Sequence, residues 1–343
     1  MRLILAHSHA NTLGGGERSV LELAHGLSQD HDVRLLLGGF DPRRTYPELA
    51  RFAHRRVGRL GWPLLRVRAD AIVTNSFGSN LLAFRNGAQL SYWVHSTRSI
   101  FLRSQATPDL VIRRAVDWLA VRRAARLVAN SQFTARKLRE LYGRDADAVV
   151  YPGVDLQLYH PGAVRGGYAI TVGRLSPEKG LERLLEVWRD LPEVPLHVIG
   201  GGDPHYLREL RALAPRGVTW RGQLLPVDVA ELLRGASVAV FAAHGEEFGL
   251  APLEAMASAV PVVAWRDGGL AETIVDGQTG FLVDDAVTFR HRLRLLLHDA
   301  PRRETFGAAA RARAEQFSWQ RTVGAMAEIC ASLAGRPDRA PLR

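Results

Sequence analysis

The segment GEEFGLAPLEAMAS, residues 245–258, contains residue types suited to binding an anionic, hydroxyl-rich ligand. Pro252 is expected in the first turn of a helix, where its missing N–H costs nothing. That helix would therefore begin near Gly249. Its end would present unpaired backbone amides, which together form an anion site. The amides in question belong to Phe248, Gly249 and Leu250.

Two carboxylates flank this predicted helix start. Glu254 would lie in or just after the first turn, and Glu246 in the loop before the helix. A favourable interaction with the helix dipole would explain Glu254 alone, but not both acids together with the glycine. Because a carboxylate next to a phosphate would repel it, both acids are better suited to accepting hydrogen bonds from hydroxyl groups. We expect Glu254 to bind a ribose and Glu246 to bind a sugar or to stabilise developing positive charge.

Two cations follow a predicted strand in the segment VGRLSPEKG, residues 172–180. Arg174 offers a planar fork and Lys179 a point charge, which is a combination suited to a diphosphate. Lys179 is unusual in this chain, because Lys137 is its only other lysine. A pair of solvated loop residues is the alternative.

A glycine turn, LGGGERS at residues 13–19, separates the first predicted strand from the first helix. Its spacing imitates a dinucleotide-binding fingerprint, but the second strand ends in LLLGGF, residues 35–40, with no acid to hold a ribose. We therefore do not expect NAD binding. Gly15 and Gly16 would still offer amides to an anion, unless the turn is purely structural.

These candidate residues sit in a chain of alternating strands and helices. Such alternation indicates parallel sheets covered by helices on both faces, with ligands beyond the carboxyl ends of the strands. Apolar runs of strand length are found at 2–6, 32–37, 71–75, 90–95, 126–130, 147–151, 168–173, 195–200, 218–222, 237–243 and 261–265. Residues 40–68, rich in arginine and proline, have no clear assignment. The fold class predicted is α/β, with two doubly wound Rossmann-like domains facing each other across a cleft.

A proline- and glycine-rich stretch, residues 151–167, resembles an interdomain linker. It predicts an N-terminal domain over 1–160 and a C-terminal domain over 161–317. A last amphipathic helix at about 318–334 is expected to pack back onto the first domain.

Composition excludes several classes of protein. Of 343 residues, 47% are hydrophobic and 23% charged, which is typical of a globular chain. The single cysteine, Cys330, excludes a disulfide framework or a cysteine-based zinc site, and no apolar run is long enough to span a bilayer. The single cysteine fits a reducing, cytoplasmic compartment, and the basic first half of the chain suggests a peripheral position at the inner face of the membrane.

The positive charge is confined to one half of the chain. Residues 1–165 contain 24 Lys plus Arg against 13 Asp plus Glu, whereas residues 166–343 contain 21 against 22. A basic half suits an anionic membrane surface or a phosphorylated substrate. No nucleic-acid-binding signature accompanies the charge, so nucleic acid is not an expected partner.

Taken together and in order, the motifs of the chain resemble those of family 4 glycosyltransferases, which have the two-domain GT-B fold. The long run from Glu246 to Val283 contains the Glu-x7-Glu pattern of that family. One departure is Ala259, where the family often has glycine. The other matching segments are GGGE (14–17), WVHS (93–96), VANSQFT (128–134), YPGVD (151–155), VGRLSPEKG (172–180) and RGQL (221–224).

The resemblance implies a transferase that moves a sugar from a nucleotide-diphosphate sugar with retention of anomeric configuration and without a metal or other cofactor. The C-terminal domain would bind the donor and the N-terminal domain the acceptor. Arg174 and Lys179 would hold the donor diphosphate, with the amides of Phe248, Gly249 and Leu250 on its other side. Glu254 would bind ribose and Glu246 the donor sugar. The segment Gly222, Gln223 and Leu224 would line the base pocket. Gly15 and Gly16 would approach the phosphate or the acceptor, and His95 would sit beside the transferred sugar.

The look of the motifs favours the branch that uses GDP-mannose, with a glycan or polyprenyl-linked lipid of surface polysaccharide or glycolipid synthesis as acceptor. Alternatives are a UDP-sugar-dependent transferase, a nucleotide-sugar epimerase of the same fold, or a degenerate, non-catalytic partner subunit. Among the histidines only His95 has motif support. His7, His9 and His160 have none.

Overall fold

The computed structural model describes residues 1–58, 60–95, 108–163 and 166–334. The described chain forms two compact units. Unit 1 combines Met1–Pro152 with the segment that begins at Trp319, and unit 2 is Gly153–Ser318.

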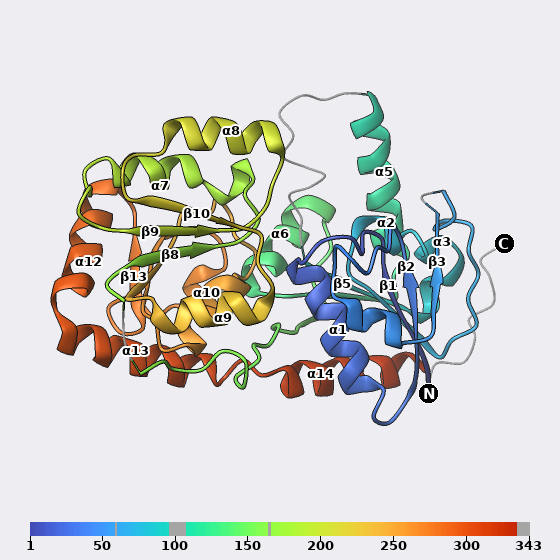
Figure 1. Ribbon diagram of the computed structural model, residues 1–343. Coiled ribbons are helices and arrows are strands. Elements are labelled where there is room, and N and C mark those ends of the chain that lie inside the picture. Colours follow the sequence, from blue (N-terminus) through green and yellow to red (C-terminus); the bar gives the residue numbers. More distant parts are fainter. Residues whose placement is uncertain (59, 96–107, 164–165, 335–343) are drawn as a thin grey trace. The chain divides into compact units, whose positions relative to one another are not determined.

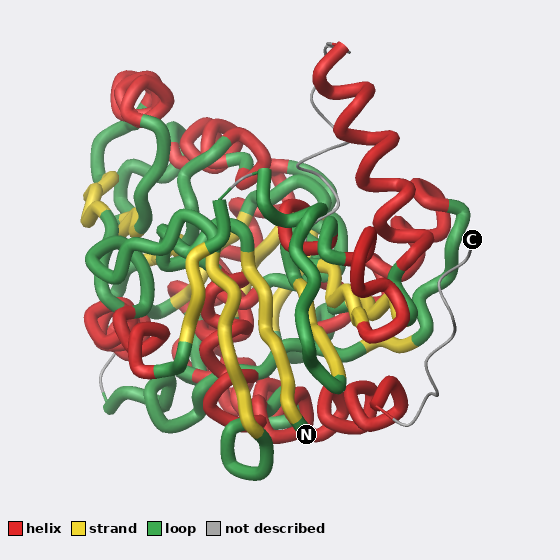
Figure 2. The backbone as a smooth tube through the Cα atoms, turned by 90° about the vertical axis from the view of Figure 1, so that its right-hand side faces the viewer, coloured by secondary structure: helices red, strands yellow, loops and turns green. Residues whose placement is uncertain are grey.

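Unit 1 is built on a seven-stranded sheet in which every pairing is parallel, in the order β3-β2-β1-β4-β5-β6-β7. Figure 2 shows these strands lying side by side. The strands are β1 (Arg2–His7), β2 (Asp32–Leu37), β3 (His54–Arg56), β4 (Ala71–Thr74), β5 (Leu90–Val94), β6 (Arg126–Ala129) and β7 (Ala148–Val149).

Both faces of this sheet are covered, because successive side chains of its apolar strands point to opposite sides. Leu3 and Leu5 of β1 pack with α1 and α14, whereas Ile4 and Ala6 pack on the face that carries α5 and α6. The helices of unit 1 are α1 (Gly15–Leu27), α2 (Phe77–Asn80), α3 (Ala83–Asn86), α5 (Pro108–Arg123), α6 (Gln132–Tyr142) and α14 (Trp319–Ala334), with 3₁₀ turns at Pro47–Arg51 and Gly87–Gln89.

The last helix, α14, lies beside α1 although more than 290 residues separate them in sequence (Figure 1). Its buried residues Met326, Cys330 and Leu333 join the same core as β1. Thr322 Oγ1 also donates a hydrogen bond to the carbonyl of Tyr151, 2.7 Å away.

Unit 2 contains a six-stranded parallel sheet in the order β10-β9-β8-β11-β12-β13. In Figure 1, α7 and α8 lie above its strands and α9 and α10 below them. The strands are β8 (Ala169–Val172), β9 (Leu196–Ile199), β10 (Val218–Gly222), β11 (Val238–Phe241), β12 (Val262–Trp265) and β13 (Gly280–Val283). The helices are α7 (Leu181–Trp188), α8 (Pro204–Leu213), α9 (Pro226–Gly235), α10 (Leu250–Ala257), α11 (Leu270–Thr273), α12 (Ala286–His298) and α13 (Ala300–Ala314), with a 3₁₀ turn at Pro177–Lys179.

The boundary between the units falls after Pro152, eight residues before the position that the sequence suggested. The physical reason is that residues 153–160 are hydrogen-bonded to unit 2. The amide of Val154 donates to the carbonyl of Phe317, and Arg311 donates to that of Tyr159. The proline- and glycine-rich stretch is therefore mostly part of the second unit.

Candidate active site

The order of the strands reverses once in unit 2, between β8 and β11. The chain runs from β8 outward through β9 and β10, then returns to β11 on the other side of β8. In open parallel sheets the loops beyond such a switch point form the ligand site. Arg174 and Lys179 follow β8, while Glu246 and Phe248 follow β11, so four of the predicted site residues lie in these two loops.

Lys179 and Glu246 are in direct contact. The Nζ atom of Lys179 lies 2.6 Å from Oε2 of Glu246, although 67 residues separate them. The side chains are 33% and 16% exposed, respectively, so the pair is partly shielded from water. Partial burial makes such a pair stronger than an ordinary surface ion pair, since water screens it less.

Hydrogen bonds to backbone carbonyls hold the loops after β8 and β11 together. The amide of His244 donates to the carbonyl of Glu178 over 2.8 Å. Arg183 donates to the carbonyls of Ala242 and Ala243, and its guanidinium stacks 4.4 Å above the ring of Trp265. The loops that carry Lys179 and Glu246 are therefore held next to each other by these hydrogen bonds, independently of the lysine side chain.

The loop after β12 supports Glu246 from the other side. The amide of Gly269 donates to the carbonyl of Glu246 over 2.6 Å. Three loops, following β8, β11 and β12, thus meet at Glu246, whose carboxylate contacts the first and whose backbone carbonyl contacts the third.

Helix α10 begins at Leu250, as the position of Pro252 predicted. Its N-cap, Gly249, has a φ of 92°, a backbone conformation that favours glycine. A Cβ atom there would also lie 2.6 Å from Cδ2 of Leu270, which would have to move. Within the first turn, Leu250 and Ala251 have amide N–H groups with no acceptor inside the helix, while Pro252 has no N–H. Phe248 precedes the cap, and its buried ring packs against Phe317.

The remaining predicted donor residues lie on the same two loops or near them. Arg174 is exposed and pairs with Glu178 at 3.0 Å. Burial opposes ionisation of Glu178, but a backbone hydrogen bond and the charges of Arg174 and Lys179 hold the pKa of Glu178 below its ordinary value. Glu254 lies half-buried on α10. The structure therefore brings both cations and both glutamates into the loops around the switch point and the helix that follows.

The predicted base-binding segment begins at Gly222, the last residue of β10, which is the edge strand of the sheet. Gly222 accepts a hydrogen bond from the amide of Gly200 over 2.8 Å, while Gln223 is exposed and Leu224 half-buried. The glycine run 200–202 after β9 is therefore a neighbour that the sequence analysis missed. Its signal was present, since three glycines directly follow a strand.

In unit 1 the strand order reverses between β1 and β4. Gly15 and Gly16 form the first turn of α1, which follows β1, and His95 follows β5. These predicted residues thus lie beyond the carboxyl ends of the strands, Gly15 and Gly16 at the start of a helix and His95 directly after its strand.

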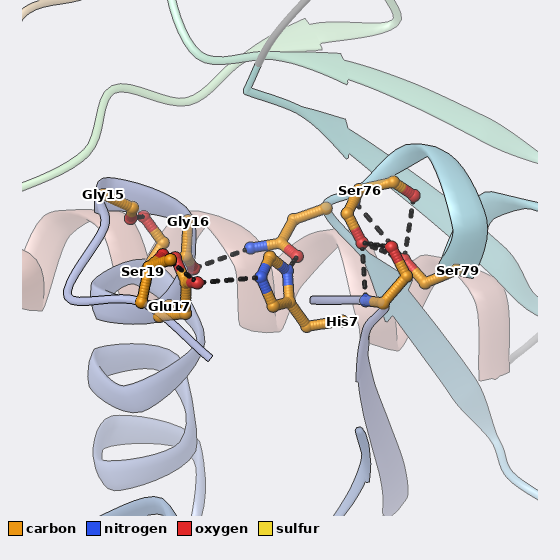
Figure 3. A network of polar contacts seen from close by, with 10 residues as sticks. His7, Gly15, Gly16, Glu17, Ser19, Ser76 and Ser79 are labelled. Carbon is orange, nitrogen blue, oxygen red and sulfur yellow. Dashed lines mark hydrogen bonds and ion pairs between the residues drawn. The ribbon is translucent and has the colours of Figure 1, made fainter. Parts of the chain in front are cut away.

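A hydrogen-bonded network fixes the glycine turn (Figure 3). His7, at the end of β1, places Nδ1 2.6 Å from Oδ1 of Asn75, which directly follows β4. The Nδ2 atom of Asn75 in turn donates to the carbonyl of Gly16 over 2.9 Å. Glu17 lies below the turn, with Oε1 2.6 Å from Oγ1 of Thr12 and 3.8 Å from Nε2 of His7.

His7 was set aside in the sequence analysis, and the structure shows that it is part of this network. Its role was hidden because its partner, Asn75, is 68 residues away in sequence and becomes a neighbour only when β1 pairs with β4. Asn75, the last residue of the predicted strand at 71–75, was likewise missed; the structure ends that strand at Thr74.

His95 is held neutral. Burial, and in second place the charge of His7, lower the pKa of His95 to about 3. Its Nε2 atom is buried, and it has no hydrogen-bond partner among the residues that the structure describes. A neutral imidazole with an unpaired ring nitrogen can donate to or accept from a ligand hydroxyl.

Within the described ranges, no cluster of three or more His, Cys, Asp or Glu residues is arranged to hold a metal ion. The described helices likewise include none long and apolar enough to cross a membrane.

Comparison with known families assigns each half of the chain. Residues 13–158 match the family described as Glycosyltransferase Family 4, and residues 164–313 match Glycosyl transferases group 1. A D-inositol 3-phosphate glycosyltransferase of Paenarthrobacter aurescens (strain TC1) is 31% identical over 317 residues, covering 82% of this chain and 77% of the relative. A protein of the same name from Segniliparus rotundus is 32% identical, covering 81% of this chain and 69% of its own.

Solved structures share the fold. Anabaena Alr3699/HepE, in complex with UDP and glucose, superposes with a TM-score of 0.82 at 19% identity, covering 96% of this chain and 99% of its own. Sucrose-phosphate synthase from Thermosynechococcus elongatus gives a TM-score of 0.81 at 21% identity, covering 97% and 99%.

Two doubly wound, parallel-sheet units with these matches define a glycosyltransferase of the GT-B fold. The chain belongs to glycosyltransferase family 4. The relatives named above are inositol-phosphate glycosyltransferases, which differ from the mannosyltransferase branch that the motifs favoured. Mannose therefore stays a prediction.

Proposed function

We propose that this glycosyltransferase moves a sugar from a nucleoside-diphosphate sugar bound by unit 2 to an acceptor bound by unit 1, with retention of anomeric configuration. The observation that carries the proposal is the Lys179–Glu246 contact at the switch point of unit 2. It joins a cation suited to phosphate with a carboxylate suited to sugar hydroxyls.

The proposed donor contacts follow from the placement of the loops. Lys179 and Arg174 bind the diphosphate, and the start of α10 at Gly249 and Leu250 supplies amides to the same group, with Phe248 packed beneath. Glu254 accepts from the ribose and Glu246 from the transferred sugar. Gly222, Gln223 and Leu224 line the base. No metal is needed in this scheme, because lysine, arginine and a helix N-terminus together stabilise the charge of the leaving diphosphate.

In the proposed donor site, Lys179 exchanges its ion-pair partner Glu246 for the diphosphate when the donor binds. A diphosphate approaching Lys179 offers it a second anionic partner, which weakens the hold of Lys179 on Glu246. The freed carboxylate can then accept from the sugar. The same contact would thereby order both ends of the donor before the bond between the anomeric carbon and the phosphate oxygen breaks.

In the proposed reaction the acceptor oxygen attacks the anomeric carbon on the face from which the diphosphate departs. The departing phosphate oxygen takes the acceptor proton, so no separate protein base is required. His95, kept neutral by its burial, is proposed to sit beside the transferred sugar and hydrogen-bond one of its hydroxyls.

For the donor we propose a UDP-sugar, because the solved structures with this fold include a complex with UDP and glucose and another with UDP-glucose. GDP-mannose is the second candidate, favoured by the motif HGEEFG at residues 244–249.

For the acceptor we propose a phosphorylated polyol or a lipid-linked glycan of surface polysaccharide or glycolipid synthesis. The names of the relatives support a phosphate on the acceptor. The glycine turn at Gly15 and Gly16, at the N-terminus of a 13-residue helix, suits such a group.

Helix α5 supports a membrane-bound acceptor. Its outward side chains Val111, Ile112, Trp118 and Leu119 are 53%, 64%, 38% and 40% exposed. Arginines at 113, 114, 122 and 123 accompany them, and the Arg122 guanidinium stacks 4.0 Å from the ring of Trp118. Exposed apolar side chains among arginines suit the surface of an anionic bilayer.

Thermal unfolding in the presence of GDP, UDP, ADP or dTDP tests the donor assignment. A nucleotide at 100 times its Kd should stabilise by about 2.7 kcal/mol, which corresponds to a rise in Tm of about 5–10 °C. A shift with UDP alone supports the UDP-sugar, and a shift with GDP alone favours mannose. If no nucleotide stabilises the folded protein, a non-catalytic partner subunit becomes the better description.

A further inference from the structure

Unit 1, like unit 2, has a side-chain contact at the point where its strand order reverses, between His7 and Asn75. His7 ends β1 and Asn75 follows β4, the two strands between which the order of that sheet reverses. Both residues are 6% exposed, so their polar side-chain groups are shielded from water. Buried polar groups are retained in proteins where their hydrogen bonds are made.

The direction of each hydrogen bond follows from the chemistry of the amide. The carbonyl of Gly16 can only accept, so the group of Asn75 that faces it is the NH₂ group, 2.9 Å away. The other end of the amide, Oδ1, then faces Nδ1 of His7 at 2.6 Å. An amide oxygen can only accept, so Nδ1 of His7 carries a proton.

The hydrogen bonds from His7 through Asn75 end at the peptide group between Gly16 and Glu17. Because a peptide is planar, holding the carbonyl of Gly16 also fixes the direction of the Glu17 N–H. The hydroxyl of Ser19 donates to the carbonyl of Gly15 over 2.8 Å and so fixes the Gly16 N–H in the same way (Figure 3). The amides of the first turn of α1 are thus held from β4 and from within the helix.

The imidazole of His7 lies beside the glycine turn. A Cβ atom on Gly16 would lie 3.1 Å from Cε1 of His7, so a side chain at this position would require the imidazole to shift. Thr12 and His7 flank the carboxylate of Glu17. Burial opposes ionisation of that carboxyl, but hydrogen bonds and the charge of His7 outweigh it and hold the pKa of Glu17 below its ordinary value.

We propose that His7 and Asn75 are positioning residues for transfer: acting in series, they hold the Gly16–Glu17 peptide, and with it the glycine turn, in the orientation that binds the acceptor. The inference rests on the proposed function of unit 1 as the acceptor-binding unit. Neither residue touches the acceptor in this scheme. Their effect is exerted through the carbonyl of Gly16, and it should therefore appear in acceptor binding and not in donor binding.

The decisive variant is Asn75→Asp. It retains an acceptor for Nδ1 of His7, but places an oxygen against the carbonyl of Gly16, where the donated hydrogen bond is lost. We expect KM for the acceptor to rise about 10- to 100-fold, with KM for the donor unchanged. His7→Leu should act in the same direction, whereas His7→Gln, which can still donate to Asn75, should recover part of the loss. His54→Gln, at an exposed histidine of the same unit, is the matched control.

Two measurements do not depend on turnover. Amide hydrogen exchange of residues 13–19 should be faster in Asn75→Asp than in the wild type, and ¹⁵N NMR of the imidazole should place a proton on Nδ1 of His7. If no acceptor is turned over by the wild type, the proposed function fails, while these two measurements still test the positioning. A His7 protonated only on Nε2, or unchanged exchange together with an unchanged acceptor KM in Asn75→Asp and His7→Leu, would overturn the inference.

Discussion

Lys179 and Glu246 meet at a distance of 2.6 Å, each in the segment that follows one of the two central strands of unit 2. The lysine proposed to bind phosphate is thus paired with a carboxylate, which also neutralises it. Replacing Lys179 and replacing Glu246 should therefore have different effects. Together the two variants separate diphosphate binding from sugar positioning.

Lys179→Gln should lower kcat/KM by about 10- to 150-fold, because a charge-assisted contact contributes about 1.5–3 kcal/mol. Lys137→Gln is a well-matched control. Lys137, the only other lysine, also pairs with a glutamate, Glu140, but on the exposed face of α6. Steady-state kinetics of both variants should show the loss in the first alone. Equal activities would remove Lys179 from the donor site.

Glu246→Gln should have a split effect. Without its anionic partner, Lys179 is free for a diphosphate, so a nucleoside diphosphate should bind at least as tightly as to the wild type. Transfer should nevertheless fall, because the carboxylate that accepts from the sugar is gone. Calorimetric titration with the nucleotide, alongside turnover, distinguishes the two. Glu231→Gln, at an exposed glutamate of α9, is the control, and weaker nucleotide binding in Glu246→Gln would contradict the exchange of partners.

Asp117 makes stability depend on pH. It is fully buried on α5, where it accepts hydrogen bonds from Asn80 and from the hydroxyl of Tyr142. Burial raises the pKa of Asp117 from an ordinary 3.8 to about 6 despite those two hydrogen bonds, which act to lower it. Between about pH 4 and 6 the folded state therefore binds more protons than the unfolded state. Stability should fall as pH rises through that window, by up to about 3 kcal/mol.

Asp117→Asn is the variant that tests this, since an amide can accept from Asn80 and donate to the oxygen of Tyr142. The difference in unfolding free energy between the variant and the wild type should grow in favour of the variant from pH 4 to pH 7, measured by denaturant titration. Asp30→Asn, at an exposed position, should show no such trend. A pH-independent difference for Asp117→Asn would show that the carboxyl titrates in its ordinary range.

Membrane binding through α5 is tested by Ile112→Ser combined with Leu119→Ser. The double variant should sediment less with vesicles that contain anionic lipid, because each replacement removes exposed apolar area from the proposed contact. Val287→Ser removes a comparably exposed side chain from unit 2 and should sediment like the wild type. No sedimentation of the wild type at low salt would remove the membrane proposal.

Most of the fold could be predicted because its strands are short, apolar and separated by helices. The run at 71–75 corresponds to β4 at Ala71–Thr74, and that at 168–173 to β8 at Ala169–Val172. Residues 40–68 resisted prediction because β3 consists of His54–Arg56, three exposed residues at the edge of the sheet, with no apolar pattern to reveal them. That strand exists because β2 offers it a free edge.

Parts of the candidate site that lie within one sequence motif could be predicted. Contacts between residues of two motifs far apart in the sequence could not. Pro252 located the start of α10 within a single segment. The contact of Lys179 with Glu246 and that of His7 with Asn75 each depend on which strands become neighbours. Strand order is decided by packing of the whole unit, so neither contact can be derived from residue spacing.

Helix α14 belongs to unit 1 although it ends the described chain, and this has a consequence for how the protein is made. During translation residues 1–152 emerge from the ribosome long before Met326, Cys330 and Leu333 are synthesised. Until then the apolar surface of α1 and β4 that these side chains cover remains exposed. Unit 2, continuous from Gly153 to Ser318, can fold during translation, whereas the unit that begins first is completed last.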